Sequence, residues 1–427
     1  MGLDAVFMGK TSPEPRAQTI LPRYFTLMLS ALVGLIYYVS NTKPQHYYDY
    51  TFRVAENLLR GQVGFTLPQP SWLNEFVPFE GFYYSVFPLG SVVSMLPFAF
   101  LKLIGLIDTM PGAFIAGLCA AISCYLFLWI AKTYEVSESR ALLMSLAMMF
   151  GTFAWTNLTI AGAWQLALGF ALVGELGAIY FTVYDRRPVI AGIFFALAFG
   201  NRTEILLTAP VFFYLLYRGD TKVQSADGLP TDGSLRLNVS TVKTLLAFCS
   251  VPFVLGVLTL IYNYVRFHSI SDFGYARIPG VLNEPWYNHG IFSVYYIPRQ
   301  AWEMLLRPWE IRNVFPYFAP NGFSSSILLS SPFLLFALRL GSRDRALKYV
   351  SWIAVIILTI LLWMHGNSGG WQFGYRYAIV LLPWLFVIML ESAPKNLSPL
   401  EWTAYGFSFL ANAYATWLFH YTNYPGR

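Results

Sequence analysis

Four charged residues recur at helical spacing soon after the first apolar segment of the chain. Asp49, Arg53, Glu56 and Arg60 stand at i, i+4, i+7 and i+11, so a helix places them on one face. One interpretation is that the four charges pair along the solvent side of the helix. The other is that Asp49, which stands among tyrosines at the membrane edge, faces a cavity and acts as a general base with a raised pKa.

Two arginines that follow apolar segments are candidates for holding an anionic group. Arg202 lies in the sequence NRTE, and Arg376 follows NSGGWQFGY, where glycines allow the backbone to approach a ligand closely. Tyr377 and Trp371 flank Arg376 and are expected to bind substrate with it. The alternative for both arginines is contact with lipid headgroups, and an ion pair with Glu204 is a further alternative for Arg202.

Other ionisable residues offer additional chemistry. Glu75 and Glu80 border the sequence FEGFYYS and are candidates for a second acid or for contacts to an acceptor. Glu175 interrupts a long apolar run, where a carboxyl group is costly and suggests a function; a neutral or interfacial side chain is the alternative. His46 lies near Asp49, but no tight ligand spacing supports a divalent metal there, and no other cofactor is expected.

The elements that must position these residues are membrane helices. The chain of 427 residues is 56% hydrophobic and only 12% charged, whereas soluble domains contain about 25% charged residues. Several runs without Asp, Glu, Lys or Arg are long enough to cross about 30 Å of hydrocarbon. They are Thr109–Ala131, Ala141–Gly174, Thr244–Val265 and Trp402–Gly426. The sequence therefore predicts one all-α polytopic domain, residues 1–427, that contacts membrane lipids and no nucleic acid.

The distribution of positive charge predicts the topology. With the N-terminus in the cytoplasm, 16 of the 28 Lys and Arg residues fall in six short inner segments, as the positive-inside rule requires. These segments are 1–23, 132–140, 185–187, 218–243, 339–348 and 391–401. Pro188–Asn201 and Ile205–Leu216 are interpreted as two short helices, because one long helix places Arg186 and Arg218 on opposite sides. About eleven spans are expected.

Two long segments, 41–111 and 266–321, are predicted to fold on the outer face and to contain juxtamembrane helices. Their length and their many aromatic residues and prolines argue against disorder. The first contains the helix that begins near Asp49, with an apolar face formed by Tyr48, Phe52, Ala55 and Leu59. It also contains Val86–Ile107, in which two prolines favour a re-entrant or surface segment over a span.

Four stretches, in this order, resemble the GT-C superfamily of glycosyltransferases that use lipid-linked sugars. They are Glu75–Phe98, Phe150–Trp164, Phe199–Pro210 and Asn367–Pro383, and they follow a first outer loop that contains an aspartate. The chain is similar to poorly characterised bacterial membrane proteins related to protein O-mannosyltransferases and to the aminoarabinose transferases of lipid A. The resemblance implies an enzyme of the bacterial inner (plasma) membrane that acts on the cell envelope.

The resemblance also implies a mechanism. A polyprenyl-phosphate sugar is the donor, Asp49 deprotonates an acceptor hydroxyl on a lipid, glycan or protein, and a hexose or pentose is transferred with inversion. Arginines such as Arg376 and Arg202 hold the phosphate. The chain departs from its look-alikes at Ile379 and Val380, where they often place an acidic residue. A non-catalytic scaffold is therefore an alternative, as is a transporter or flippase of lipid-linked sugars, although no internal repeat supports transport.

Overall fold

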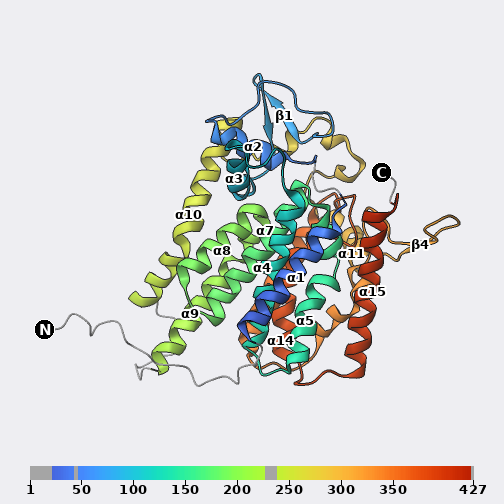
Figure 1. Ribbon diagram of the computed structural model, residues 1–427. Coiled ribbons are helices and arrows are strands. Elements are labelled where there is room, and N and C mark those ends of the chain that lie inside the picture. Colours follow the sequence, from blue (N-terminus) through green and yellow to red (C-terminus); the bar gives the residue numbers. More distant parts are fainter. Residues whose placement is uncertain (1–21, 43–46, 227–237, 425–427) are drawn as a thin grey trace.

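The computed structural model describes residues 22–42, 47–226 and 238–424. These residues form a bundle of helices with a smaller folded region at one end (Figure 1). The longer helices are α1 Arg23–Ser40, α4 Gly112–Lys132, α5 Glu138–Phe150, α7 Ala163–Ile179, α8 Pro188–Asn201, α9 Ala209–Ala226, α10 Val239–Phe267, α13 Arg345–Met364, α14 Leu382–Ser392 and α15 Pro399–Tyr421. The remaining elements are α2 Tyr50–Leu59, β1 Phe76–Phe79, β2 Phe82–Ser85, α3 Leu89–Leu103, α6 Ala154–Ile160, α11 Ile297–Leu305, β3 Glu310–Ile311, β4 Phe318–Ala319 and α12 Ile327–Ser330.

Five helices in the described part of the chain are long and apolar enough to cross a membrane. They are α1, α4, α7 with its continuation to Tyr184, α10 and α13. A sixth span results if α5 and α6, which meet at a bend of 47°, count as one. This mostly helical structure with five or six candidate spans is what an all-α membrane protein requires. The count of about eleven spans stays a prediction, since α3 and α8 are apolar but short.

Small residues let neighbouring helices approach closely. A Cβ atom on Gly34 of α1 would lie 2.7 Å from the carbonyl oxygen of Gly117 in α4, and a Cβ on Gly90 of α3 would lie 2.3 Å from the Cα of Gly200 in α8. Close backbone packing of this kind holds membrane helices together where lipid gives no hydrophobic driving force. It fixes α3, part of the segment predicted to be re-entrant, against the end of α8.

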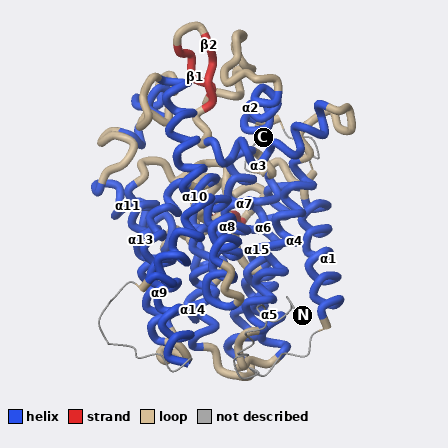
Figure 2. The backbone as a smooth tube through the Cα atoms, turned by 90° about the vertical axis from the view of Figure 1, so that its left-hand side faces the viewer, coloured by secondary structure: helices blue, strands red, loops and turns tan. Residues whose placement is uncertain are grey.

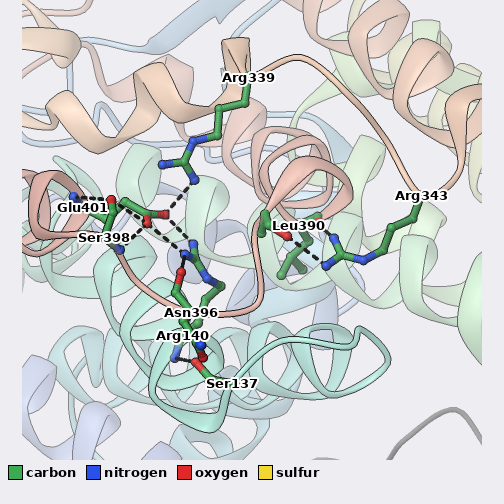
Figure 3. A network of polar contacts seen from close by, with 9 residues as sticks. Ser137, Arg140, Arg339, Arg343, Leu390, Asn396, Ser398 and Glu401 are labelled. Atoms are coloured by element: carbon green, nitrogen blue, oxygen red, sulfur yellow. Dashed lines mark hydrogen bonds and ion pairs between the residues drawn. The ribbon is translucent and has the colours of Figure 1, made fainter.

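A network of polar contacts joins the helix ends and loops at one end of the bundle (Figure 3). Arg140 near the start of α5 donates to Glu401 of α15 over 2.9 Å, and Arg339 donates to the same carboxylate over 2.6 Å. Arg343 donates to the backbone carbonyl of Leu390 over 2.6 Å. Arg140 and Glu401 are both fully buried. Segments 132–140, 339–348 and 391–401, which the charge pattern assigned to one side, therefore meet at one end.

The segments 185–187 and 218–220 reach this end as well. Arg186 donates to Asp220 over 2.8 Å, and Arg218 donates to Asp344 over 2.8 Å. Two helices form here as predicted, separated by a 3₁₀ segment at Thr203–Thr208, and the first has the predicted bounds. The second begins at Ala209 rather than Ile205 and continues to Ala226. Segments 1–21 and 227–237 lie outside the described residues.

The opposite end carries the smaller folded region, which includes α2, α3 and the hairpin of β1 and β2 (Figures 1 and 2). Helix α2 forms where the charge spacing predicted a helix, and its Phe52 and Ala55 are buried. Its charges pair along the helix: Arg53 lies 2.7 Å from Asp49, and Arg60 lies 2.6 Å from Glu56. The described residues 47–111 are thus folded, whereas the assignment of 41–111 to an outer loop stays a prediction.

Two short hairpins in the described part of the chain were not predicted from the sequence. β1 pairs antiparallel with β2, with Phe76 opposite Ser85, and the turn between them consists of Glu80 and Gly81, both with positive φ. β3 and β4 form a second pair within the second outer segment, which is otherwise built from α11 and short 3₁₀ turns. The strands are too short to show the alternation of apolar and polar residues that identifies a strand from sequence.

Candidate active site

A cavity of about 1250 Å³ lies at the end of the bundle opposite the buried arginine network. Helix α13 begins beside that network and ends next to His365, and α15 runs from Glu401 in the network to His420. Both histidines line the cavity. The cavity is therefore separated from the polar network by the length of these helices, which places it at the end that the topology predicts to be outside.

The walls of the cavity come from distant parts of the sequence. The segment between α2 and β1 contributes Glu75, the first turn of α7 contributes Trp164, and the end of α8 leads into Arg202. The loop between α13 and α14 contributes Trp371 and Arg376. Five of the six predicted substrate-binding residues thus line one cavity: Glu75, Arg202, Trp371, Arg376 and Tyr377.

Arg376 is a buried cation, with only 6% of its surface exposed. The loop before it turns sharply at Gly369 and Gly370, both with positive φ, and a Cβ on Gly369 would lie 3.0 Å from the Arg376 Nε. Its guanidinium donates to the Gly370 carbonyl and to the Tyr377 hydroxyl, each over 3.3 Å, while Nε has no partner within the described ranges of the chain.

Among the described residues, no carboxylate forms an ion pair with Arg376. A buried charge is costly unless an opposite charge or several hydrogen bonds compensate for it. A guanidinium that lacks a carboxylate but faces a cavity is suited to bind an anion such as a phosphate, which accepts its N–H groups in a bidentate manner.

Arg202 differs from Arg376 because its charge is balanced. Its Nε donates to Glu204 over 2.7 Å, as one interpretation of the sequence predicted. The Arg202 Cζ also lies 4.7 Å from the centre of the Tyr377 ring, and the Arg376 Cζ lies 5.1 Å from the same ring. Tyr377 therefore brings both guanidinium groups to one part of the cavity.

Glu75 lies on the wall between α2 and β1 and is held by Trp164. The indole Nε1 donates to both carboxylate oxygens, over 2.8 and 3.0 Å. The Trp164 ring packs against Tyr48 and Tyr50, and the Arg376 Cζ lies 5.9 Å from its centre. The Trp164 indole thus contacts both the Glu75 carboxyl group and Arg376, the arginine that has no carboxylate in an ion pair with it among the described residues.

The environment of Glu75 raises the pKa of its carboxyl to about 7. Removal of the carboxyl group from water is the largest cause. The bond from Trp164 and the positive charge of Arg376 oppose this effect, and the negative charge of Glu284 adds to it. A carboxyl group with this pKa exchanges a proton readily near neutral pH, which is what general acid–base catalysis requires.

The other predicted carboxylates lie outside the lining of the cavity. Asp49 precedes the first turn of α2 and is paired with Arg53; burial raises the pKa of Asp49, and Arg53 opposes the rise. Glu80 lies at the exposed turn between β1 and β2, and its carboxylate lies 2.9 Å from His268. The Oε1 of Glu175 accepts a bond of 3.0 Å from Trp384 within the helices and contributes nothing to the cavity wall.

Two acceptor oxygens on residues of the cavity wall have no hydrogen-bond partner among the residues that the structure describes. They are Oε1 of Gln165 in α7 and Oδ1 of Asn201 in α8, both on residues that are at least 97% buried. Buried polar atoms are normally paired. Like Nε of Arg376, both oxygens are enclosed by protein atoms, so they are incompletely paired groups within the wall rather than atoms open to the cavity.

Trp164 and His365 line the cavity but were not predicted as site residues from the sequence. Trp164 ends one of the stretches that resemble the superfamily, but its partner Glu75 lies 89 residues away, and no sequence spacing indicates such a contact. His365 directly precedes the glycine-rich segment before Arg376, and this position was the feature of the sequence that could have identified it as a site residue. His46 lies outside the described residues, and the described ones contain no group of three or more His, Cys, Asp or Glu arranged to hold a metal ion.

Comparison of the chain with protein-family models, with curated proteins and with solved structures finds no match. The fold and the site therefore define the protein as a mostly helical one with candidate membrane spans and a polar cavity at one end. The resemblance to GT-C glycosyltransferases stays a prediction.

Proposed function

We propose that the protein is a glycosyltransferase that moves a sugar from a polyprenyl-phosphate donor to an acceptor hydroxyl group. One observation carries the proposal: an unbalanced buried arginine, Arg376, and a carboxyl group with a pKa of about 7, Glu75, share a cavity at the ends of the membrane helices. A donor with an anionic phosphate, a hydroxylated sugar and an apolar tail matches the charge, polarity and position of this cavity. The resemblance of four sequence stretches to GT-C enzymes supports the same conclusion.

In this mechanism Arg376 binds the phosphate of the donor, and Arg202 and Tyr377 position it. The Glu75 carboxylate accepts the proton of the acceptor hydroxyl while the hydroxyl oxygen forms a bond to the anomeric carbon. The bond from that carbon to the phosphate oxygen breaks, and the phosphate leaves with the electron pair. Because the phosphate is stable as an anion and Arg376 balances its added charge, a second carboxylic acid is not needed as it is in glycosidases.

The geometry favours Glu75 over Asp49 as the general base. Asp49 does not line the cavity, and its carboxylate is paired with Arg53. Glu75 lines the cavity, is linked through Trp164 to Arg376, and has the pKa that a base working near neutral pH needs. The role of Asp49 stays a prediction that a matched pair of variants, Glu75→Gln and Asp49→Asn, can decide.

The proposal includes the location of the reaction. The cavity lies at the end opposite the basic segments 132–140, 339–348 and 391–401, so the positive-inside rule assigns it to the outer face of a bacterial plasma membrane with the N-terminus in the cytoplasm. A polyprenyl donor stays in the bilayer, and the acceptor hydroxyl belongs to a lipid, glycan or protein of the cell envelope.

The test uses the purified full-length chain in lipid vesicles. Polyprenyl-phosphate hexoses and pentoses are supplied as donors, with a membrane extract as the source of acceptors. We expect release of polyprenyl phosphate and a new glycoside of inverted anomeric configuration. Binding of polyprenyl phosphate without any release would support the scaffold alternative, and movement of intact donor across the bilayer would support transport.

A further inference from the structure

A histidine that the proposed mechanism does not use lies within the same cavity. His365 follows the last residue of α13 and is surrounded by four aromatic rings. Its ring centre lies 5.2 Å from that of Phe292, 5.9 Å from Tyr287, 6.0 Å from Tyr377 and 6.2 Å from Tyr275. These contacts fix the position of the imidazole, so that its two nitrogens have defined surroundings.

The hydrogen bond to Asn367 defines the tautomer of His365. Nδ1 lies 2.7 Å from the Asn367 carbonyl oxygen, and a carbonyl oxygen only accepts, so Nδ1 carries the proton. Removal from water lowers the pKa of His365 to about 4, the positive charges of Arg202 and Arg376 act in the same direction, and the Asn367 bond opposes them. At neutral pH, Nε2 is therefore a bare acceptor.

No protein partner for Nε2 is present in the described part of the chain. In this part of the chain the tyrosine hydroxyl groups make other bonds and none to Nε2: those of Tyr275 and Tyr287 bond to each other over 2.9 Å, and that of Tyr377 accepts from Arg376. A half-buried acceptor without a donor, on the wall of a cavity, is suited to receive a hydrogen bond from a ligand.

The position of His365 identifies the part of the ligand that it meets. The Tyr377 ring is contacted by the imidazole and by the guanidinium groups of Arg202 and Arg376, so His365 lies beside the place assigned to the phosphate. In a polyprenyl-phosphate sugar the pyranose or furanose ring is joined directly to that phosphate. We infer that Nε2 of His365 accepts a hydrogen bond from a hydroxyl group of the donor's sugar and makes His365 a specificity-determining residue; this inference rests on the proposed function.

Two substitutions distinguish the roles of the two ring nitrogens of His365. In His365→Asn the amide N–H takes the place of Nδ1–H and keeps the bond to the Asn367 carbonyl, but no acceptor replaces Nε2. In His365→Gln the longer amide reaches the position of Nε2 with its oxygen and restores an acceptor. A loss in the Asn variant that the Gln variant recovers therefore reports on the acceptor rather than on the packing of the loop.

The experiment measures binding of two lipids to the full-length chain in nanodiscs. One is bare polyprenyl phosphate, and the other is the polyprenyl-phosphate hexose or pentose that the wild-type protein binds more tightly. We expect His365→Asn to weaken binding of the sugar-bearing lipid about tenfold, the worth of one hydrogen bond, with bare polyprenyl phosphate unaffected and with partial recovery in His365→Gln.

Equal weakening for both lipids would show a structural role for His365 and overturn the inference, as would no weakening at all. Either result would leave the proposed function intact, because the wild-type protein still binds the donor. A wild-type protein that binds neither lipid would instead overturn the proposed function, and the inference with it.

Discussion

Replacement of Trp164 by Phe tests how Glu75 acquires its proton affinity. The substitution keeps an aromatic ring against Tyr48 and Tyr50 but removes the Nε1–H that donates to both carboxylate oxygens over 2.8 and 3.0 Å. This bond stabilises the ionised form and lowers the pKa of Glu75, so its loss raises the pKa. A hydrogen bond to a charged group contributes about 1.5–3 kcal/mol, and about 1.4 kcal/mol corresponds to one pH unit.

The pKa of Glu75 therefore rises from about 7 by about one to two pH units in Trp164→Phe. A general base works only when it is ionised, so the wild-type rate of transfer increases with pH through about 7. In the variant this increase moves to higher pH, and the rate at pH 7 falls roughly 5- to 50-fold because less of the carboxyl is ionised.

The assay follows the release of polyprenyl phosphate by the wild-type protein and by Trp164→Phe in vesicles. It gives kcat/KM at each pH between about 5.5 and 10. At about pH 10 we expect the variant to approach the wild-type rate, because Glu75 is then ionised in both proteins. If the dependence of kcat/KM on pH were unchanged, or if kcat/KM fell equally at every pH, the ionisation of Glu75 would not explain the fall in rate at low pH.

Three further results are expected. Arg376→Ala should weaken binding of polyprenyl phosphate by roughly 10- to 100-fold, as loss of a charge-assisted bond predicts, measured by titration in nanodiscs. Arg140→Ala should lower the free energy of unfolding in detergent by about 3–5 kcal/mol, because Glu401 is then buried with one cation fewer. In a variant without the native cysteines, Gln62→Cys should react with an impermeant thiol reagent on intact cells, whereas Lys395→Cys should react only after permeabilisation.

Each of these results has its own control. Arg376→Lys keeps the charge but lacks the planar fork and should recover binding only in part; unchanged affinity in both variants would make Arg376 a structural residue. Arg187→Ala breaks an exposed ion pair with Asp185 and should cost less than about 1 kcal/mol, so an equal loss in Arg140→Ala would contradict the importance of the buried network. Labelling of Lys395→Cys alone on intact cells would reverse the orientation.

Much of the scaffold could be predicted from sequence, because its determinants are local. Runs without charge mark the long helices, and the periodicity from Asp49 to Arg60 marks α2. The positive-inside rule groups basic residues that do meet at one end, including Arg140 and Arg339. Each of these signals depends only on composition or on neighbours within a few turns of helix.

The arrangement within the cavity depends on contacts between distant residues and could not be predicted in the same way. The charge pattern drew attention to Asp49, yet that pattern reflects ion pairs along α2. Glu75 shows no pattern of its own, and its raised pKa arises from burial and from Trp164 and Arg376, which lie far away in sequence. Arg376 could be found because the glycines before it are a local feature.

The most direct test of the proposed function is the single-turnover rate of sugar transfer in Glu75→Gln, compared with Asp49→Asn. Gln has nearly the shape of Glu and can still interact with Trp164, but it cannot accept a proton. We predict that Glu75→Gln binds the polyprenyl-phosphate donor normally and transfers its sugar about 10²- to 10⁴-fold more slowly, while Asp49→Asn transfers at nearly the wild-type rate. A nearly normal rate in Glu75→Gln together with a large loss in Asp49→Asn would contradict the account and assign the general base to Asp49.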